Sequence, residues 1–160
     1  MLKDIELHNI CLKNNISISV AESCTSGKVA SYLSNFSGSS NYFKGGIIAY
    51  QDNVKCGLLN IDQGLIAKYS SVSSHVAKSM AISVRNIFSS DFAVATTGYA
   101  GPFAEPMSLL GNAYVAIAFD GGVFCKKLKF KGSRIEITNQ ITEHAFLLLK
   151  EKIKKAVMVS

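Results

Sequence analysis

Residues 17–33 read SISVAESCTSGKVASYL. Apolar residues alternate with serine from Ser17 to Ala21, which is typical of a short β-strand. A turn rich in hydroxyl groups follows over 22–27, and the residues from Lys28 to Leu33 are typical of a helix. A strand that passes through such a turn directly into a helix indicates an α/β protein.

The rest of the chain continues this alternation and adds a hairpin near its end. We expect strands over 45–50, 92–96, 112–119 and 123–131, the last two joined by Asp120-Gly121-Gly122. Helices are expected over 2–14, from Asp52, after Ser73 as N-cap, and from Ser133 or Thr138 to about Lys155. The pattern predicts a three-layer α/β/α sandwich with a mixed sheet.

Length and composition predict one domain over residues 1–160. The chain has 160 residues, of which 48% are hydrophobic and 18% charged, as in a well-packed globular protein. The first residues, MLKDIELHNI, place charges where a signal peptide would be apolar. No apolar run approaches the ~18–20 residues of a membrane span. We therefore expect a cytoplasmic protein that does not associate with a membrane.

The cysteines and histidines are too scattered to predict a metal site or a disulfide framework. The 4 cysteines and 3 histidines form no Cys-x-x-Cys pair and no local cluster. We expect no metal and no cofactor.

A net charge of +6 raises the question of nucleic-acid binding. Lys127, Lys129 and Lys131 alternate with apolar residues, as on an edge strand protected by lysines. Further lysines over 150–155 suit the carboxyl end of a helix. We favour these roles over nucleic-acid binding, and the surplus charge also suits an anionic small-molecule substrate.

Three loops rich in Gly, Ser and Thr are candidate ligand sites. Hydroxyls and backbone N–H groups over 22–27 suit an anion, although helix capping by Ser23 or Thr25 is the better interpretation from local sequence. The loop over 38–46 is a weak signal alone. The glycines of the turn over 97–102 have two equally good explanations: they let a ligand come close to the backbone, or they allow a tight turn that needs positive φ.

Four stretches together resemble a known family. They are VAESCTSG (20–27), GSSNYFKGGIIAYQDNVK (38–55), VSSHVAKSMA (72–81) and TGYAGP (97–102). They are similar, in order, to the CinA C-terminal-domain family, which includes nicotinamide-nucleotide amidohydrolases. The resemblance implies hydrolysis of the carboxamide of nicotinamide mononucleotide to nicotinate mononucleotide and ammonia.

The resemblance also implies roles for particular residues. It places a serine nucleophile at Ser40 and a lysine at Lys55, whose reacting atoms should then lie within ~4 Å, directly or through one water. The full implied set is Ser40, Lys55, Tyr50 and Thr97 as catalytic residues, with Glu22, Thr25, Ser39, Gly46, Gly98 and Arg134 binding substrate.

The segment over 103–112 departs from the family, which has a Gly-rich loop and an EKPVGTV-like stretch there. This departure supports an alternative, a catalytically weak or inactive member that binds a nucleotide or a protein partner. The length resembles the stand-alone form of the family, and a homodimer is a possible assembly. Without the resemblance, Arg134 would be interpreted as a surface residue that pairs with Glu136 or with solvent.

Overall fold

A computed structural model describes residues 5–159 of the chain. The helices are α1 (Ile5–Asn14), α2 (Lys28–Leu33), α3 (Asp52–Leu59), α4 (Gln63–Tyr69), α5 (Ser74–Phe88) and α6 (Arg134–Val159), with short 3-10 helices η1 (Ser39–Asn41) and η2 (Met107–Leu109). The strands are β1 (Ile18–Glu22), β2 (Phe43–Ile48), β3 (Phe92–Gly98), β4 (Asn112–Phe119) and β5 (Gly122–Lys129).

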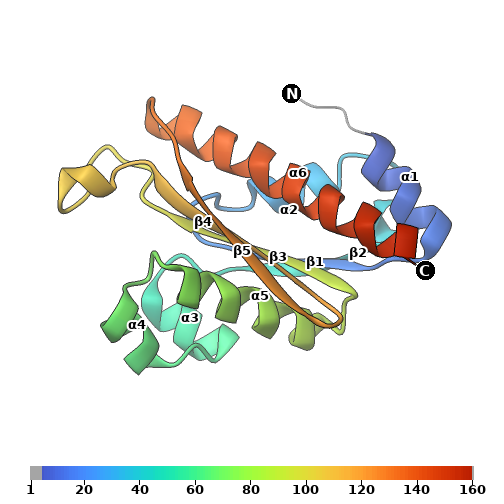
Figure 1. The fold of residues 1–160 in the computed structure, drawn as a ribbon, viewed down its shortest axis with the longest axis horizontal. Helices are drawn as coiled ribbons and strands as arrows, with labels where there is room; N and C mark the ends of the chain where they lie inside the picture. Colours follow the sequence, from blue (N-terminus) through green and yellow to red (C-terminus); the bar gives the residue numbers. More distant parts are fainter. Residues whose placement is uncertain (1–4, 160) are drawn as a thin grey trace.

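The strands form one mixed sheet, as the sequence predicts. Their order is β2-β1-β3-β4-β5 (Figure 1). β1 pairs in parallel with both β2 and β3, whereas β4 is antiparallel to β3 and to β5. β4 and β5 form the expected hairpin across residues 120–122.

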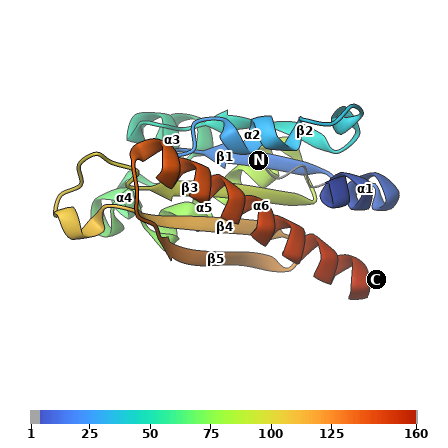
Figure 2. The same cartoon turned by 90° about the horizontal axis from the view of Figure 1, so that it is seen from above.

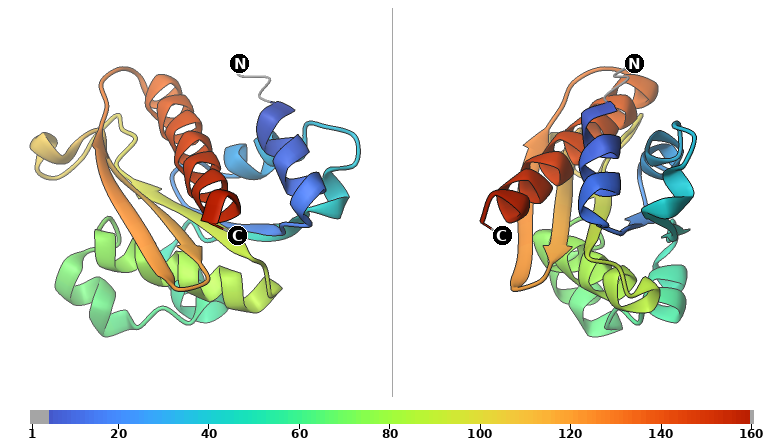
Figure 3. Two further views of the ribbon diagram at one scale, coloured as in Figure 1. Left: turned by 45° about the vertical axis from the view of Figure 1, so that its right-hand side comes forward. Right: turned by 90° about the vertical axis from the view of Figure 1, so that its right-hand side faces the viewer.

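Helices cover both faces of the sheet, which confirms the three-layer sandwich. α1, α2 and α6 lie on one face, and α3, α4 and α5 lie on the other (Figures 1 and 3). The first face buries branched residues of the strands among α1, α2 and α6. The second face carries small side chains where α5 packs, and this allows the helix to lie close to the strands. These are Ala21, Ala93, Ala95, Ala116 and Ala118.

Local capping explains where the two longer helices begin. Ser73 Oγ accepts a hydrogen bond from Val76 N at 3.2 Å, as the predicted N-cap of α5 should. Ser133, rather than Thr138, precedes α6: its backbone N and Oγ both donate to Glu136 Oε2. α6 continues to Val159, past the predicted end at about Lys155.

The two edges of the sheet differ in charge. β5 forms one edge, and its exposed residues include Lys126, Lys127 and Lys129, which confirms the predicted lysine-rich edge strand. β2 forms the other edge (Figure 2). Its sequence, FKGGII, contains one charged residue, Lys44.

The parallel strands all end at one side of the molecule. Glu22 at the end of β1 lies opposite Ile48 of β2 and Thr96 of β3. We call this side, with the loops after β1, β2 and β3, the carboxyl end of the sheet. The hairpin returns the chain to the same side, because β5 runs antiparallel to β4 and α6 then begins at Arg134.

Several further details differ from the sequence prediction. β2 lies two residues earlier than expected, and β5 ends at Lys129 rather than at residue 131. Helix α4 was not predicted, and it is short, with Asp62 as its N-cap. The first residues of the predicted helix over 2–14 lie outside the described residues. Within residues 5–159, no helix combines the length and apolar character needed to cross a membrane.

Candidate active site

A polar cavity of about 230 Å³ lies at the carboxyl end of the sheet. We call it the site cavity. It is lined by Ser23, Cys24, Tyr50, Asp52, Lys55, Ser71, Val72, Thr97, Gly98, Tyr99, Ala100 and Arg134. Open α/β sheets bind their ligands at this position, outside the carboxyl ends of parallel strands.

Five of the residues implied by the resemblance meet in this cavity. They are Tyr50, Lys55, Thr97, Gly98 and Arg134. The fold brings them together because β1 separates β2 from β3 while both strands end at the same side. The start of α6 adds Arg134 from far along the chain.

Lys55 is the most deeply buried cation of the site. It lies in α3 and is 2% exposed. Its Nζ donates to Tyr50 O at 3.3 Å and to Asp52 Oδ1 at 3.1 Å. A buried amine needs such partners to offset the loss of hydration. The side chain of Asp52 is 56% exposed, so the ion pair lies where the cavity meets solvent.

Asp52 is held in the ionised state by its neighbours. Burial alone would raise the pKa of this carboxyl, but hydrogen bonds from Ser71 and Lys55, and the charge of Lys55, lower the pKa below its ordinary value. Ser71 Oγ donates directly to Asp52 Oδ1. Asp52 therefore fixes the position of the Lys55 side chain.

Arg134 connects two loops at the opening of the cavity. Its Nη1 donates to Gly101 O at 2.5 Å and its Nη2 donates to Tyr50 Oη at 2.5 Å. It therefore does not pair with Glu136, which instead accepts hydrogen bonds from Ser133. A guanidinium has five N–H groups, so most remain available to a ligand.

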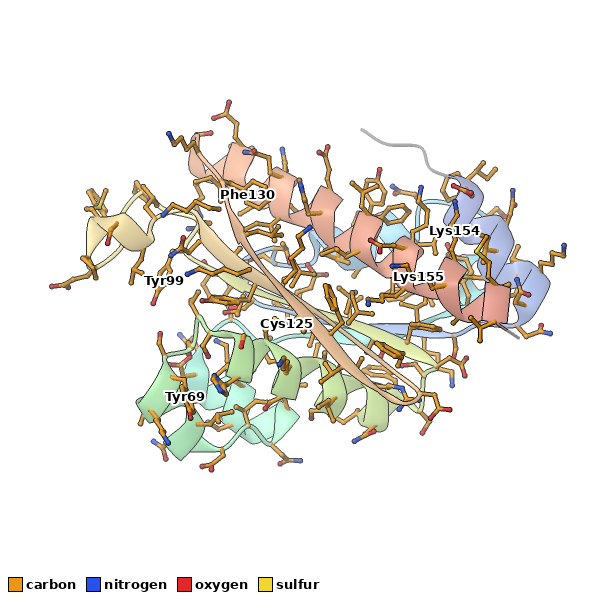
Figure 4. All side chains as sticks on the ribbon, viewed as in Figure 1. Tyr69, Tyr99, Cys125, Phe130, Lys154 and Lys155 are labelled. Carbon is orange, nitrogen blue, oxygen red and sulfur yellow. The ribbon has the colours of Figure 1, made fainter. Side chains whose placement is uncertain are left out.

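The end of β3 supplies the Thr97 hydroxyl to the site cavity, and at Gly98 its backbone packs closely against β4. Thr97 Oγ1 donates to Ser71 O at 2.9 Å, which ties β3 to the loop before α5. At Gly98 an added Cβ would lie 2.9 Å from Ala113 Cβ and 3.0 Å from Asn112 O, so only glycine fits against β4. Tyr99, labelled in Figure 4, lies at this same end of the sheet, and its hydroxyl is 3.1 Å from Ser70 Oγ.

Ser40 lies outside the site cavity. It belongs to η1, which precedes β2, whereas Lys55 lies in α3, which follows β2; the two segments lie at opposite ends of the strand (Figure 2). The strand between them spans about 17 Å at ~3.3 Å per residue. The expectation that Ser40 Oγ and Lys55 Nζ meet within one chain is therefore wrong, because the chain runs straight through β2 without doubling back.

Two further predicted binding residues lie away from the cavity. Ser39 shares η1 with Ser40. Gly46 lies within β2, where an added Cβ would fall 2.2 Å from Val20 Cγ2. Close packing against β1 therefore explains this glycine without a ligand.

Glu22 and Thr25 are buried rather than open to the cavity. Glu22 is 1% exposed and Thr25 is 0% exposed. The Glu22 carboxylate accepts from Thr25 Oγ1 at 2.5 Å and from three backbone N–H groups, those of Gly27, Val29 and Ala30. The two residues hold the loop before α2 together, and this structural role accounts for their burial; their role in substrate binding stays a prediction.

The cavity also contains polar residues that the sequence interpretation did not assign to chemistry. Ser23, Cys24, Asp52 and Ser71 all line it. Ser23 and Cys24 directly follow β1, and ligand-binding residues of such sheets gather after the carboxyl ends of strands. The position of these two residues in the sequence could therefore have indicated that they line the site. Burial raises the pKa of the Cys24 thiol to about 12, so it remains protonated and weakly nucleophilic at neutral pH.

A larger groove of about 720 Å³ lies between α2 and α6. Its cation, Lys28, donates to Thr138 Oγ1 at 2.6 Å and to Asn139 Oδ1 at 2.7 Å, so it joins the two helices. None of the residues implied by the resemblance lines this groove. The smaller site cavity is thus the better candidate. Within residues 5–159, no three His, Cys, Asp or Glu side chains gather as metal ligands.

The fold and cavity define a mixed α/β sandwich with a polar site at the carboxyl ends of its parallel strands. Residues 4–153 match the CinA C-terminal domain family, and the chain belongs to this family.

Similar proteins and structures agree with this assignment. A CinA-like protein of Flavobacterium psychrophilum is 39% identical over 153 residues, which are 95% of this chain and 37% of that protein. The chain thus spans little more than a third of that relative. A CinA superfamily protein of Klebsiella pneumoniae has a TM-score of 0.89 at 25% identity, covering 93% of this chain and 94% of its own. A competence/damage inducible protein of Agrobacterium tumefaciens has a TM-score of 0.83 at 27% identity, covering 90% and 92%.

Proposed function

We propose that this chain hydrolyses the carboxamide of nicotinamide mononucleotide, releasing ammonia and nicotinate mononucleotide. One observation carries the proposal: Lys55, Tyr50, Thr97 and Arg134, which come from separate segments, line a single cavity. These are the residue types that the similarity to nicotinamide-nucleotide amidohydrolases implies at these positions.

The proposed reaction proceeds through a serine ester. A serine Oγ bonds to the carboxamide carbon as its proton passes to the Lys55 amine. The C–N bond then breaks, and the proton returned by Lys55 lets the nitrogen leave as ammonia. Water attacks the ester, which releases nicotinate mononucleotide and restores the serine.

Three other cavity residues, Tyr50, Arg134 and Asp52, have roles in the proposed reaction. The Tyr50 hydroxyl accepts from Arg134, so its own proton is available to the oxyanion that forms on the carboxamide. Arg134 uses one N–H on Tyr50 and one on Gly101, and its other N–H groups bind the phosphate. Asp52 holds Lys55 in position for the proton transfer.

The direct test is incubation of the purified protein with nicotinamide mononucleotide. We expect stoichiometric ammonia and nicotinate mononucleotide, with activity that survives EDTA because no step requires a metal. Release of neither product would contradict the proposal.

Arg134→Lys tests the phosphate contact. A lysine keeps the charge but cannot donate two parallel hydrogen bonds, so KM for nicotinamide mononucleotide should rise at least about tenfold. KM for the unphosphorylated riboside should change little. Equal changes for both compounds would show that Arg134 supports the site only through Tyr50 and Gly101.

A second candidate function is nucleotide binding without catalysis. It is favoured by the position of Ser40, which leaves the site cavity of one chain without the implied nucleophile. Calorimetric binding of nicotinamide mononucleotide without ammonia release would support this alternative.

A further inference from the structure

We infer that the groove between α2 and α6 is a second ligand site, which binds a free α-amino acid with an uncharged polar side chain. The inference concerns binding alone and does not depend on the proposed function. It rests on two side chains of opposite charge, Lys28 and Glu143, that line the groove without forming an ion pair within residues 5–159.

The groove is separate from the site cavity, although the same parts of the chain border both. α2 and α6 lie over the same face of the sheet (Figure 2). In the loop before α2, Ser23 and Cys24 line the site cavity, whereas Gly27 lines the groove. In α6, Arg134 lines the site cavity, and Asn139, more than one turn later, lines the groove. None of the described residues lines both, so a ligand in the groove leaves the site cavity open.

Lys28 supplies the positive end of the proposed site. Its Nζ donates to Thr138 Oγ1 at 2.6 Å and to Asn139 Oδ1 at 2.7 Å, and both acceptors are uncharged. The charge of the ammonium group is therefore not neutralised by these partners. An ammonium group has three N–H groups, so one is left for a ligand. Because the first two are already bound, the third has a fixed direction, which lowers the entropy cost of binding a carboxylate.

The start of α2 does not offer a second position for an anion. The N–H groups of Gly27, Val29 and Ala30 donate to the Glu22 carboxylate and are thus occupied from within the chain. The other charged residue that lines the groove, Glu143, would repel a multiply charged anion. The groove therefore suits a single carboxylate at Lys28 better than a phosphate.

Glu143 supplies the negative end of the proposed site. It is partly buried, and within residues 5–159 its carboxylate has neither an ion pair nor a hydrogen bond. Leaving a partly buried carboxylate without a partner is unfavourable, and an ammonium group from a ligand would offset this cost. Glu143 follows Asn139 by four residues, so the two lie on one face of α6 with about 5–6 Å between their Cβ atoms. The Lys28 ammonium group, which is bound to Asn139, is thus about one helical turn from Glu143.

The two ends of a free α-amino acid match these charges. Its carboxylate and ammonium groups are attached to a single carbon atom. One molecule can therefore extend from Lys28 to Glu143, with a charge-assisted hydrogen bond of about 2.8 Å at each end. A ligand with only one of the two charges would leave either Lys28 or Glu143 without an ionic partner.

The neighbouring polar residues indicate the kind of side chain. Ser31 and Asn35 line the groove three and seven residues after Lys28, a spacing that places them on the same side of the helix. Neither side chain has a hydrogen-bond partner in the part of the chain that the structure describes. A carboxamide, such as that of glutamine, both donates and accepts hydrogen bonds, as a hydroxyl and an amide require.

Calorimetric titration of the full chain with L-glutamine tests the site. Glutamine should bind, and Lys28→Met and Glu143→Gln should each weaken binding at least about tenfold, because each removes one charge-assisted hydrogen bond. Lys131→Met and Glu151→Gln, at exposed residues outside the groove, are matched controls and should leave Kd unchanged. Thermal unfolding checks that each variant is folded. Glu143→Gln removes no ion pair or hydrogen bond within residues 5–159, so it remains a valid test if Lys28→Met unfolds.

Two derivatives of glutamine test which charge meets which residue. N-acetyl-L-glutamine lacks the ammonium charge, so acetylation should weaken binding to the wild type but not to Glu143→Gln. The α-amide of L-glutamine lacks the carboxylate charge, so amidation should weaken binding to the wild type but not to Lys28→Met. Equal losses in the wild type and the variants would overturn the inference.

Two further results would also overturn it. One is the absence of binding by L-glutamine, L-asparagine and L-serine at about 10 mM, a concentration that reveals even weak complexes. The other is binding that survives both groove variants and is displaced by nicotinamide mononucleotide, which would place the amino acid in the site cavity. If glutamine binds as expected but nicotinamide mononucleotide is not hydrolysed, the proposed function fails while the second site stands.

Discussion

Lys55→Met should lower amide hydrolysis by at least about 1,000-fold, because the variant loses the group that we propose takes the proton from serine. Methionine replaces the buried aliphatic stem, and Lys55 is 2% exposed, so the packing of α3 is preserved. Asp52, whose side chain is 56% exposed, remains hydrated without its partner. The free energy of unfolding should therefore change by only about 1 kcal/mol.

The measurement is the rate of ammonia release at saturating nicotinamide mononucleotide, together with thermal unfolding. Lys68→Met is the matched control, since Lys68 is an exposed lysine of the neighbouring helix α4 and should retain full activity. A folded Lys55→Met enzyme with more than about a tenth of the wild-type rate would exclude Lys55 as the base.

Glu22→Leu should destabilise the fold by about 3–5 kcal/mol, the range for removing one partner of a buried charged network. The substitution leaves the N–H groups of Gly27, Val29 and Ala30, and the buried Thr25 hydroxyl, without their acceptor. These groups begin α2, so the loop between β1 and α2 should lose its fixed conformation.

Urea unfolding followed by circular dichroism measures this effect. Glu22→Gln keeps one acceptor oxygen and should be less destabilised than Glu22→Leu. Glu105→Leu, on an exposed loop residue, should change the stability by less than about 1 kcal/mol. A stable Glu22→Leu protein that fails to bind nicotinamide mononucleotide would instead support the predicted role of Glu22 in substrate binding.

Much of the fold follows from local sequence signals. The helix over 28–33, the hairpin at 120–122 and the N-cap at Ser73 all form as predicted, because each depends on residues close together in the chain. The shift of β2 has a local cause as well. The prediction starts the strand at Gly45, although glycine is a weak strand signal. In the structure β2 begins at Phe43, so Phe43 and Lys44 lengthen the strand on the side before the glycines.

The site depends on which strands are neighbours, and no local pattern contains this information. Tyr50, Thr97 and Arg134 meet because β1 inserts between β2 and β3 and the hairpin returns α6 to the carboxyl end. The resemblance to the family indicated these residues, but not where they lie relative to one another. It also placed Ser40 with Lys55, and the length of one strand separates them. Ser23 was interpreted as a cap, although the strand before it ends at the ligand side of the sheet.

The hydrogen bond between Arg134 and Tyr50 joins residues 84 positions apart. During synthesis on the ribosome, the strand and loop that carry Tyr50 emerge long before the helix that carries Arg134. A growing chain can thus assemble β1, β2 and β3 while the opening of the cavity still lacks its guanidinium. The hydrogen bonds that Arg134 makes at the opening of the site cavity can therefore form only after the start of α6 has been synthesised.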